Sequence, residues 1–137
     1  FVHGAVLPHH VLVHPVSHDF ILVDWTSASK IGGPQRTPYM VSRYKDFYPD
    51  STAAKEPPTA SGDIHMAART MQALLGKGVT TPGQIVYWDR GCPPQIRSFL
   101  AGCISPSSFT AWEMLDLFTE LIERLWGKRQ YREFPWP

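Results

Sequence analysis

The sequence predicts an α+β fold that is mostly α-helical, and three observations lead to this class. Two short segments near the start, 11–14 and 20–24, are rich in β-branched and aromatic residues. The stretch 26–58 then changes to Gly, Pro, Ser, Thr and Lys. From about residue 61 onwards, apolar residues recur with helical spacing. One small sheet followed only by helices is typical of an α+β arrangement in which helix dominates.

The two apolar segments predict a β-hairpin, because the residues 15–18 that join them form a short connection beginning with Pro15. The stretch 26–58 has few apolar runs. A loop of this length in a compact domain is usually functional or mobile. We therefore expect it to lie outside the core.

A first helix is predicted from about residue 61 to residue 75. Ser61 or Asp63 can cap its start, and Gly76 and Gly78 stop it. Its apolar residues are spaced for one buried face. They are Ile64, Ala67, Ala68, Met71, Leu74 and Leu75.

Two further helices are predicted near the end of the chain. Pro93 and Pro94 can open one of them. Thr110 and Glu113 form a capping-box pattern that starts the other, which should end before Gly127. We expect the apolar stripes of both helices to belong to the core rather than to a groove for a partner. These stripes consist of Ile96, Phe99, Leu100 and Cys103, and of Leu115, Phe118, Leu121, Ile122 and Leu125.

Composition narrows the class of protein. The chain has 137 residues and a net charge of +1, which fits one domain and indicates no nucleic-acid partner. It has no apolar run of about 18 residues, so we expect no membrane contact. Cys92 and Cys103 lie among apolar residues and predict buried, reduced thiols in a cytoplasmic protein. The sequence opens at Phe1, within a stretch that predicts regular structure, so we expect a fragment or a chain whose earlier part is missing.

The start of the chain has the layout of a tight loop and two strands, the second of which ends in an acid. The loop consists of His3-Gly4-Ala5-Val6-Leu7-Pro8-His9-His10, and the second strand ends in Asp24-Trp25-Thr26. This layout resembles the catalytic loop and the metal-binding segment in the C-terminal lobe of the protein-kinase-like fold. The resemblance extends over nearly the whole chain through the order and spacing of weak motifs. It is nearest to divergent kinase-like proteins of bacteria.

The resemblance implies that the catalytic loop lacks the side chains that accept the substrate proton and bind Mg²⁺ in the family. In the family, an Asp two residues after the His accepts the substrate proton, and an Asn five residues later holds Mg²⁺. Aligned on His3, the Asp position is Ala5, the neighbouring Lys position is Leu7, and the Asn position is His10. A methyl group cannot accept a proton, and imidazole is a poor ligand for Mg²⁺. We expect His3 to order the loop backbone rather than to perform acid–base chemistry.

Asp24 has two interpretations. By the resemblance, it stands where the family places the Asp of Asp-Phe-Gly, a metal ligand. From the residues alone, it is an acid at the end of a strand that caps the following turn. Both interpretations stay open at the level of sequence.

Two more motifs support the resemblance. Tyr48-Pro49-Asp50 resembles the Ala-Pro-Glu that closes the activation segment. Gly62-Asp63 resembles the start of the lobe's central helix, which implies that Asp63 ties that helix to the backbone of the catalytic loop. The Arg that usually pairs with the acid at position 50 is replaced by Phe109, so we expect that ion pair to be missing.

These observations predict a single kinase-like C-lobe. Its parts are a catalytic-loop-like segment with the hairpin at 1–25, an activation-segment-like loop at 26–60, a helical core at 61–127 and a tail at 128–137. The chain has no Gly-rich loop and no strand Lys of the N-terminal lobe, which in the family hold the nucleotide. We therefore expect no bound cofactor in the chain alone, and ATP with Mg²⁺ only if an N-lobe lies upstream.

The predicted function is that of a catalytically impaired, pseudokinase-type module that binds a protein partner or another domain of its parent chain. An atypical ATP- and Mg²⁺-dependent kinase, acting on a protein or a small molecule, is the first alternative. A small structural or metal-binding helical domain is the second. That second alternative rests on five histidines within sixteen positions, three of which could form a zinc site. They are His3, His9, His10, His14 and His18.

Overall fold

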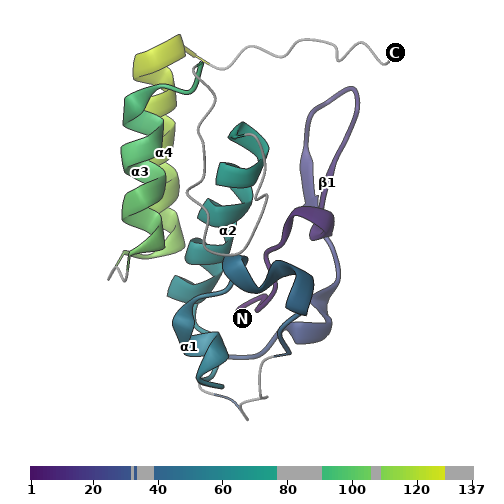
Figure 1. Cartoon of the computed structure of the whole chain (residues 1–137). Helices are drawn as coiled ribbons and strands as arrows, with labels where there is room; N and C mark the ends of the chain where they lie inside the picture. Colours follow the sequence, from purple (N-terminus) through teal and green to yellow (C-terminus); the bar gives the residue numbers. More distant parts are fainter. Residues whose placement is uncertain (32, 34–38, 77–90, 106–108, 129–137) are drawn as a thin grey trace.

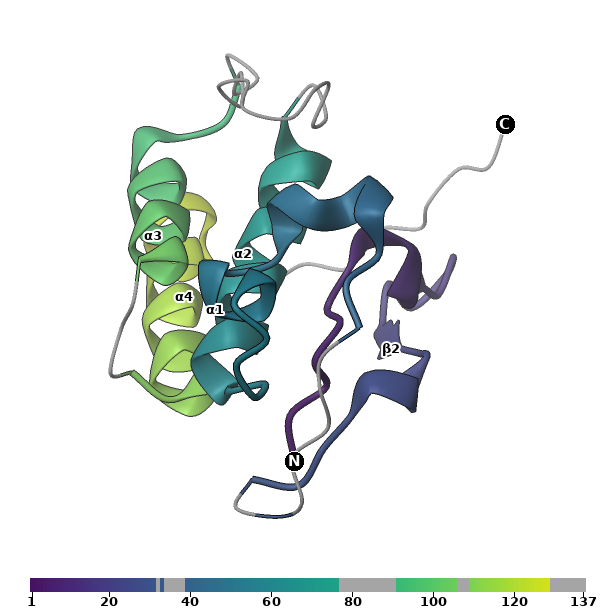
Figure 2. The ribbon, with the colours of Figure 1, turned by 60° about the horizontal axis from the view of Figure 1, so that its bottom comes forward.

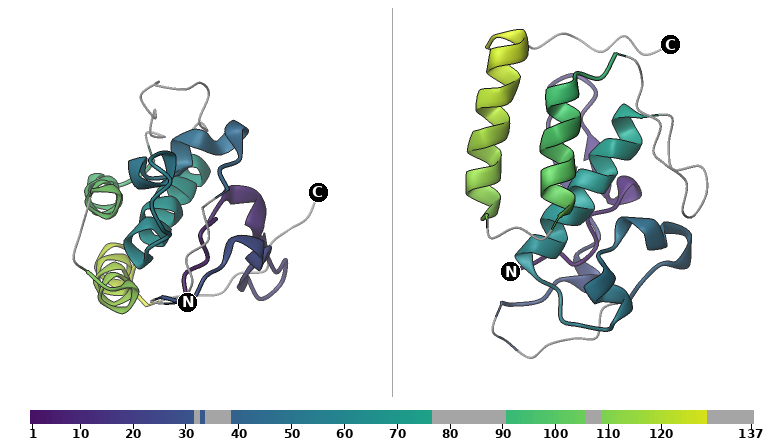
Figure 3. Two further views of the ribbon diagram at one scale, coloured as in Figure 1. Left: turned by 90° about the horizontal axis from the view of Figure 1, so that it is seen from below. Right: turned by 60° about the vertical axis from the view of Figure 1, so that its left-hand side comes forward.

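Helix α2 (Ala60–Leu75) lies in the middle of the molecule. The chain is described by a computed structural model covering residues 1–31, 33, 39–76, 91–105 and 109–128. Helices α3 (Pro94–Ile104) and α4 (Ala111–Trp126) pack along one side of α2, and the N-terminal segment with a small hairpin lies on the other side (Figures 1 and 3). The fold class is α+β and mostly helical, as predicted.

The predicted hairpin is present. A short 3-10 helix, η1 (Pro8–His10), leads into strand β1 (Val11–Val13), which pairs antiparallel with β2 (Phe20–Leu22). Val11 pairs with Leu22 and Val13 with Phe20 in this register. Figure 2 shows the N-terminal segment running between α2 and this hairpin.

The stretch 26–58 is more structured than predicted. It includes most of the 3-10 helix η2 (Trp25–Ser27), the 3-10 helix η3 (Ser42–Phe47) and the one-turn helix α1 (Asp50–Ala53). Phe47 and Tyr48 are buried in one hydrophobic cluster with Ala5, Leu7 and Met66. The prediction that this stretch stays outside the core was therefore wrong for these two aromatic residues. Two adjacent apolar residues are too few to produce a periodic signal in the sequence.

The start of α2 differs from the prediction. Thr59, rather than Ser61 or Asp63, is the N-cap, and its hydroxyl accepts a hydrogen bond from the amide of Gly62 at 3.0 Å. The helix ends at Leu75, as predicted, and Gly76 caps it. The second predicted stop, at position 78, lies outside the described residues.

Helix α2 is buried on two faces, not one. Met66 belongs to the cluster with Leu7, whereas Ala68 belongs to a second cluster with the buried residues of α3. At about 100° per residue, these two side chains point to opposite sides of the helix. Leu74 and Leu75, which were predicted to be buried, are exposed. The apolar face therefore ends one turn earlier than its spacing indicates.

Helices α3 and α4 begin where the sequence predicts, and α4 also ends as predicted. The capping box of Thr110 and Glu113 is formed, and Gly127 ends α4. Ile96, Leu100 and Cys103 of α3 are buried, whereas no residue of α4 is buried. Leu115 is exposed, contrary to the prediction. The half-buried side of α4 is formed by Met114, Phe118, Leu121, Ile122 and Leu125.

Cys92 and Cys103 are both free and buried, as predicted. Among the helices of the described part, none is long and apolar enough to cross a membrane.

Candidate functional site

Asp63 holds the segment that resembles a catalytic loop. Its carboxylate accepts the backbone N–H of His3 at 2.6 Å and that of Gly4 at 2.8 Å. Burial raises the pKa of Asp63, while the two backbone hydrogen bonds and the nearby His3 act to lower it. The resemblance implies the same link, from Asp63 to the backbone of the catalytic-loop-like segment. The residue that was expected to cap the helix instead joins it to a chain segment 60 positions away.

The backbone of the loop fits closely against η2. Gly4 has a φ of +76°, and a Cβ added there would lie 2.7 Å from the carbonyl oxygen of Ser27. Both the positive φ and the close approach favour glycine at this position. Val2 and Ser29 exchange backbone hydrogen bonds of 2.9 and 3.0 Å, which fasten the segment on the same side.

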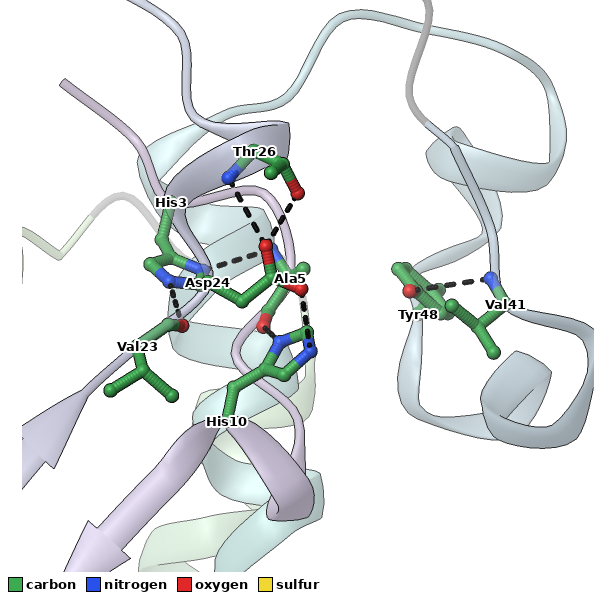
Figure 4. Close-up of polar contacts among 8 residues, drawn as sticks. All are labelled: His3, Ala5, His10, Val23, Asp24, Thr26, Val41 and Tyr48. Atoms are coloured by element: carbon green, nitrogen blue, oxygen red, sulfur yellow. Dashed lines mark hydrogen bonds and ion pairs between the residues drawn. The ribbon is translucent and has the colours of Figure 1, made fainter.

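His3 orders the loop through its ring. Its Nε2 lies 3.1 Å from the carbonyl oxygen of Val23, and its Nδ1 accepts the N–H of Ala5 at 3.3 Å (Figure 4). These contacts suit a neutral imidazole that carries its proton on Nε2. The ring also meets the edge of Trp25, with 4.6 Å between the ring centroids. All of these contacts serve the local structure of the loop.

His10 and Asp24 contact each other. The Nε2 of His10 lies 3.2 Å from the Oδ2 of Asp24, and the Nδ1 of His10 lies 2.8 Å from the carbonyl oxygen of Ala5 (Figure 4). His10 is buried and has an acceptor at each ring nitrogen. The two positions at which the resemblance implies metal ligands are thus paired with one another.

Asp24 also caps the turn that follows it. Its backbone is left-handed, with a φ of 59°, and its Oδ1 accepts hydrogen bonds from the amide and the hydroxyl of Thr26. The hydrogen bonds from Thr26, with a smaller contribution from His10, lower the pKa of Asp24. Both carboxylate oxygens therefore have protein partners. This geometry agrees with the interpretation of Asp24 as a turn cap.

Ala5 and Leu7 face the interior. Both belong to the hydrophobic cluster with Phe47, Tyr48 and Met66, and Leu7 is fully buried. The two side chains that the resemblance aligns with the family's catalytic Asp and Lys therefore pack in the interior and cannot exchange protons. Tyr48 lies on this cluster, and its hydroxyl accepts the amide of Val41 at 3.4 Å (Figure 4).

Pro49 and Asp50 lie at the start of α1. Pro49 is its N-cap, and Asp50 is exposed in its first turn. Among the residues that the structure describes, no side chain forms an ion pair with Asp50. Beside Pro49 is a small pocket whose lining has no titratable side chain. The lining residues are Gly4, Pro49, Ser51, Thr52, Pro58, Thr59, Gly62 and Met66.

Two polar contacts of α2 were not predicted. The hydroxyl of Thr70 donates to the carbonyl oxygen of Val6 at 2.9 Å, and the Nδ1 of His65 lies 2.9 Å from the carbonyl oxygen of Ile104. Burial is the main cause of a lowered pKa at His65. A polar residue between apolar positions of a helix is the only sequence signal for such contacts, and that pattern is also common on exposed faces.

The histidines do not form a zinc site. All five lie in the described part of the chain, within which no group of three or more His, Cys, Asp or Glu side chains is arranged to hold a metal ion. His14 instead accepts the amide of Ser17 at 3.0 Å in the hairpin turn. This finding counts against the metal-binding alternative.

We found no match to the chain among protein-family models, curated proteins or solved structures. Its function is therefore inferred from the contacts of His10, Asp24 and Asp63 and from its exposed surfaces.

Proposed function

We propose that the chain is the C-terminal lobe of a divergent kinase-like protein of bacterial type, cytoplasmic and catalytically impaired. In this proposal it acts as a module that binds a protein partner or another domain of its parent chain. The kinase-like frame then serves as a scaffold rather than as a catalyst.

One observation carries this proposal: the pairing of His10 with Asp24. A Mg²⁺ ion coordinated by Asp24 needs carboxylate oxygens that are free to bind it. Here Thr26 contacts Oδ1 and His10 contacts Oδ2. The apolar Ala5 at the position of the family's catalytic base supports the same conclusion, because it cannot accept a proton.

The hairpin supports an interaction role. It exposes apolar side chains on both of its faces, and a two-stranded sheet is at best marginally stable alone in water. These side chains are Leu12, Val13, Val16, Phe20 and Ile21. A partner or a neighbouring domain that covers the hairpin would bury this surface.

An atypical kinase remains the second candidate, since one feature of Asp24 favours it. Its carboxylate is partly exposed, and its lowered pKa keeps it ionised at neutral pH. An upstream lobe that carried nucleotide and Mg²⁺ could compete with His10 for this carboxylate.

The deciding experiment uses the full-length parent polypeptide. A ligand that binds the native state raises the thermal unfolding temperature. We expect the impaired protein not to bind ATP and Mg²⁺, so its unfolding temperature should be the same with and without them. We also expect no phosphoryl transfer to proteins or small molecules. Transfer that is abolished by Asp24→Ala, but not by the control Glu56→Ala at an exposed acid, would overturn the proposal and establish the kinase alternative.

A further inference from the structure

Helix α4 forms the outer edge of the molecule. It packs against α3 and α2 with one side, while the rest of its surface faces solvent (Figures 1 and 3). Although its inner side contacts the second hydrophobic cluster, none of its residues is buried. A helix of this kind needs only one apolar side to hold it in place.

The apolar surface of α4 extends beyond that inner side. Trp112 is 76% exposed, Leu115 52% and Trp126 61%. With about 3.6 residues per turn, these three side chains and Thr119 follow one line along the helix, next to the half-buried Ile122. We call the surface formed by Trp112, Leu115 and Trp126 the α4 flank. Two exposed tryptophans on one line are unusual on a surface that only meets water.

An acidic ridge borders the α4 flank. Asp116 and Glu123 are seven residues apart, so they lie on one side of the helix, and both are exposed. The whole helix has four acidic residues and one basic residue, whereas the chain has a net charge of +1. Within the described part of the chain, neither Asp116 nor Glu123 forms an ion pair.

We infer that the α4 flank is a docking surface for a basic amphipathic helix of a partner protein, whose apolar side covers the tryptophans and whose Lys or Arg side chains face the acidic ridge. This inference names the class of partner that the proposed interaction module binds. It therefore rests on the proposed function. Helix-on-helix packing uses apolar residues that share one side of a helix, and the three flank residues, three and eleven positions apart, share such a side. Buried tryptophans supply much of the binding energy of such interfaces.

The acidic ridge disfavours two other occupants. A second copy of the chain would bring two acidic ridges together, and like charges across an interface oppose association. An anionic membrane surface would repel the ridge for the same reason. A basic helix is therefore the occupant that the charges favour.

Synthetic peptides can test the inference. The probe is a fluorescent amphipathic helix of Leu and Lys, and the control is the same pattern with Glu in place of Lys. We expect the Leu/Lys peptide to bind the chain at least about tenfold more tightly than the Leu/Glu peptide, and more weakly as salt is added. Equal binding of the two peptides, or no binding of either, would overturn the inference.

Variants locate the binding surface. Trp112→Ala with Trp126→Ala should weaken Leu/Lys binding by about tenfold or more. Asp116→Lys with Glu123→Lys should reverse the preference toward the Leu/Glu peptide. The matched controls, Tyr39→Ala with Leu74→Ala and Glu56→Lys, are exposed positions outside both α4 and the hairpin and should leave binding unchanged. Binding that responds to the controls as strongly as to the α4 variants would contradict the assignment.

Two further readouts separate the possible failures. Circular dichroism should show that the exposed α4 substitutions leave the fold intact. Sedimentation should show a monomer, and a dimer that disappears in the tryptophan variant would instead make a second copy the occupant. A failed peptide test leaves the impaired-kinase proposal standing, whereas phosphoryl transfer that depends on Asp24 removes that proposal whatever the peptides do.

Discussion

Asp63 and Thr70 lie two turns apart on the same face of α2, and both bind the backbone of the N-terminal segment. Asp63 accepts the amides of His3 and Gly4, and Thr70 donates to the carbonyl oxygen of Val6. The central helix therefore fixes this segment through its polar side chains as well as through Met66. The loop geometry depends on both kinds of contact.

Replacing Asp63 should loosen the loop. Asp63→Ala leaves two partly buried amides without acceptors, and we expect it to lower the free energy of unfolding by about 3 kcal/mol. Asp63→Asn keeps one acceptor and should lower it by about 1–2 kcal/mol. Urea unfolding measures both, with Glu56→Ala as the exposed control. Equal stability of Asp63→Ala and the control would show that these hydrogen bonds do not hold the loop.

Restoring an acid at position 5 should damage the fold rather than recover a catalyst. Ala5→Asp buries a carboxyl group beside Leu7 and Phe47, and we expect it to cost about 3 kcal/mol or more. Ala54→Asp, at an exposed position, should change stability by less than about 1 kcal/mol. Thermal unfolding of the two variants compares them. A well-folded Ala5→Asp protein would mean that the position opens to solvent.

The capping box of α4 should make stability depend on pH. Hydrogen bonds from the backbone and the hydroxyl of Thr110 lower the pKa of Glu113 below its ordinary value of 4.5. A lowered pKa in the folded state contributes stability that is present above pH 4.5 and is lost as the pH falls through the folded-state pKa. Urea unfolding across the acid range should therefore show wild type more stable than Glu113→Gln at neutral pH, with a gap that closes on acidification. A constant gap would contradict this.

His65 should produce a second pH effect nearer neutrality. Burial lowers its pKa below 6.5, so stability should decrease as the pH falls through that value toward the folded-state pKa. In His65→Asn, the amide can still donate to the carbonyl oxygen of Ile104 but does not titrate. Between about pH 7.5 and about pH 5.5, wild type should lose stability relative to this variant. Parallel loss in both proteins would rule out His65 as the cause.

Two leucines should distinguish the true core from the predicted one. Leu100 is buried in the second cluster, whereas Leu74 was predicted to be buried and is exposed. Leu100→Ala should lower the free energy of unfolding by about 2–5 kcal/mol because it leaves a cavity. Leu74→Ala should change it by no more than about 0.5 kcal/mol. Chemical denaturation of the two variants measures the difference.

The elements that depend on local sequence could be predicted. The hairpin, the C-terminal end of α2, the start of α3 and the capping box of Thr110 all follow from residues close together in the chain. The burial of Tyr48 and the second buried face of α2 could not, because each depends on a segment far away in sequence. A periodic pattern shows which residues share a face, and it does not show how many faces will be covered.

The candidate site was predictable in part. The capping of Thr26 by Asp24 was one of two interpretations, and the link from Asp63 to the loop came from the resemblance. The pairing of His10 with Asp24 was not predicted, although it follows from the hairpin register. That register places Val11 opposite Leu22, so the residue before one strand meets the residues just after the other. The length of each strand had to be known before this pairing could be derived.

The position of α2 between two hydrophobic clusters also sets an order of assembly. The contacts of α2 with α3 join two helices that are neighbours in the chain, whereas the hydrogen bonds of α2 to His3 and Val6 span 60 and 64 residues. During synthesis on a ribosome, the segment with His3 and Val6 emerges before α2 and cannot dock until α2 has followed it. We therefore expect this segment to reach its native place only after α2 has been synthesised.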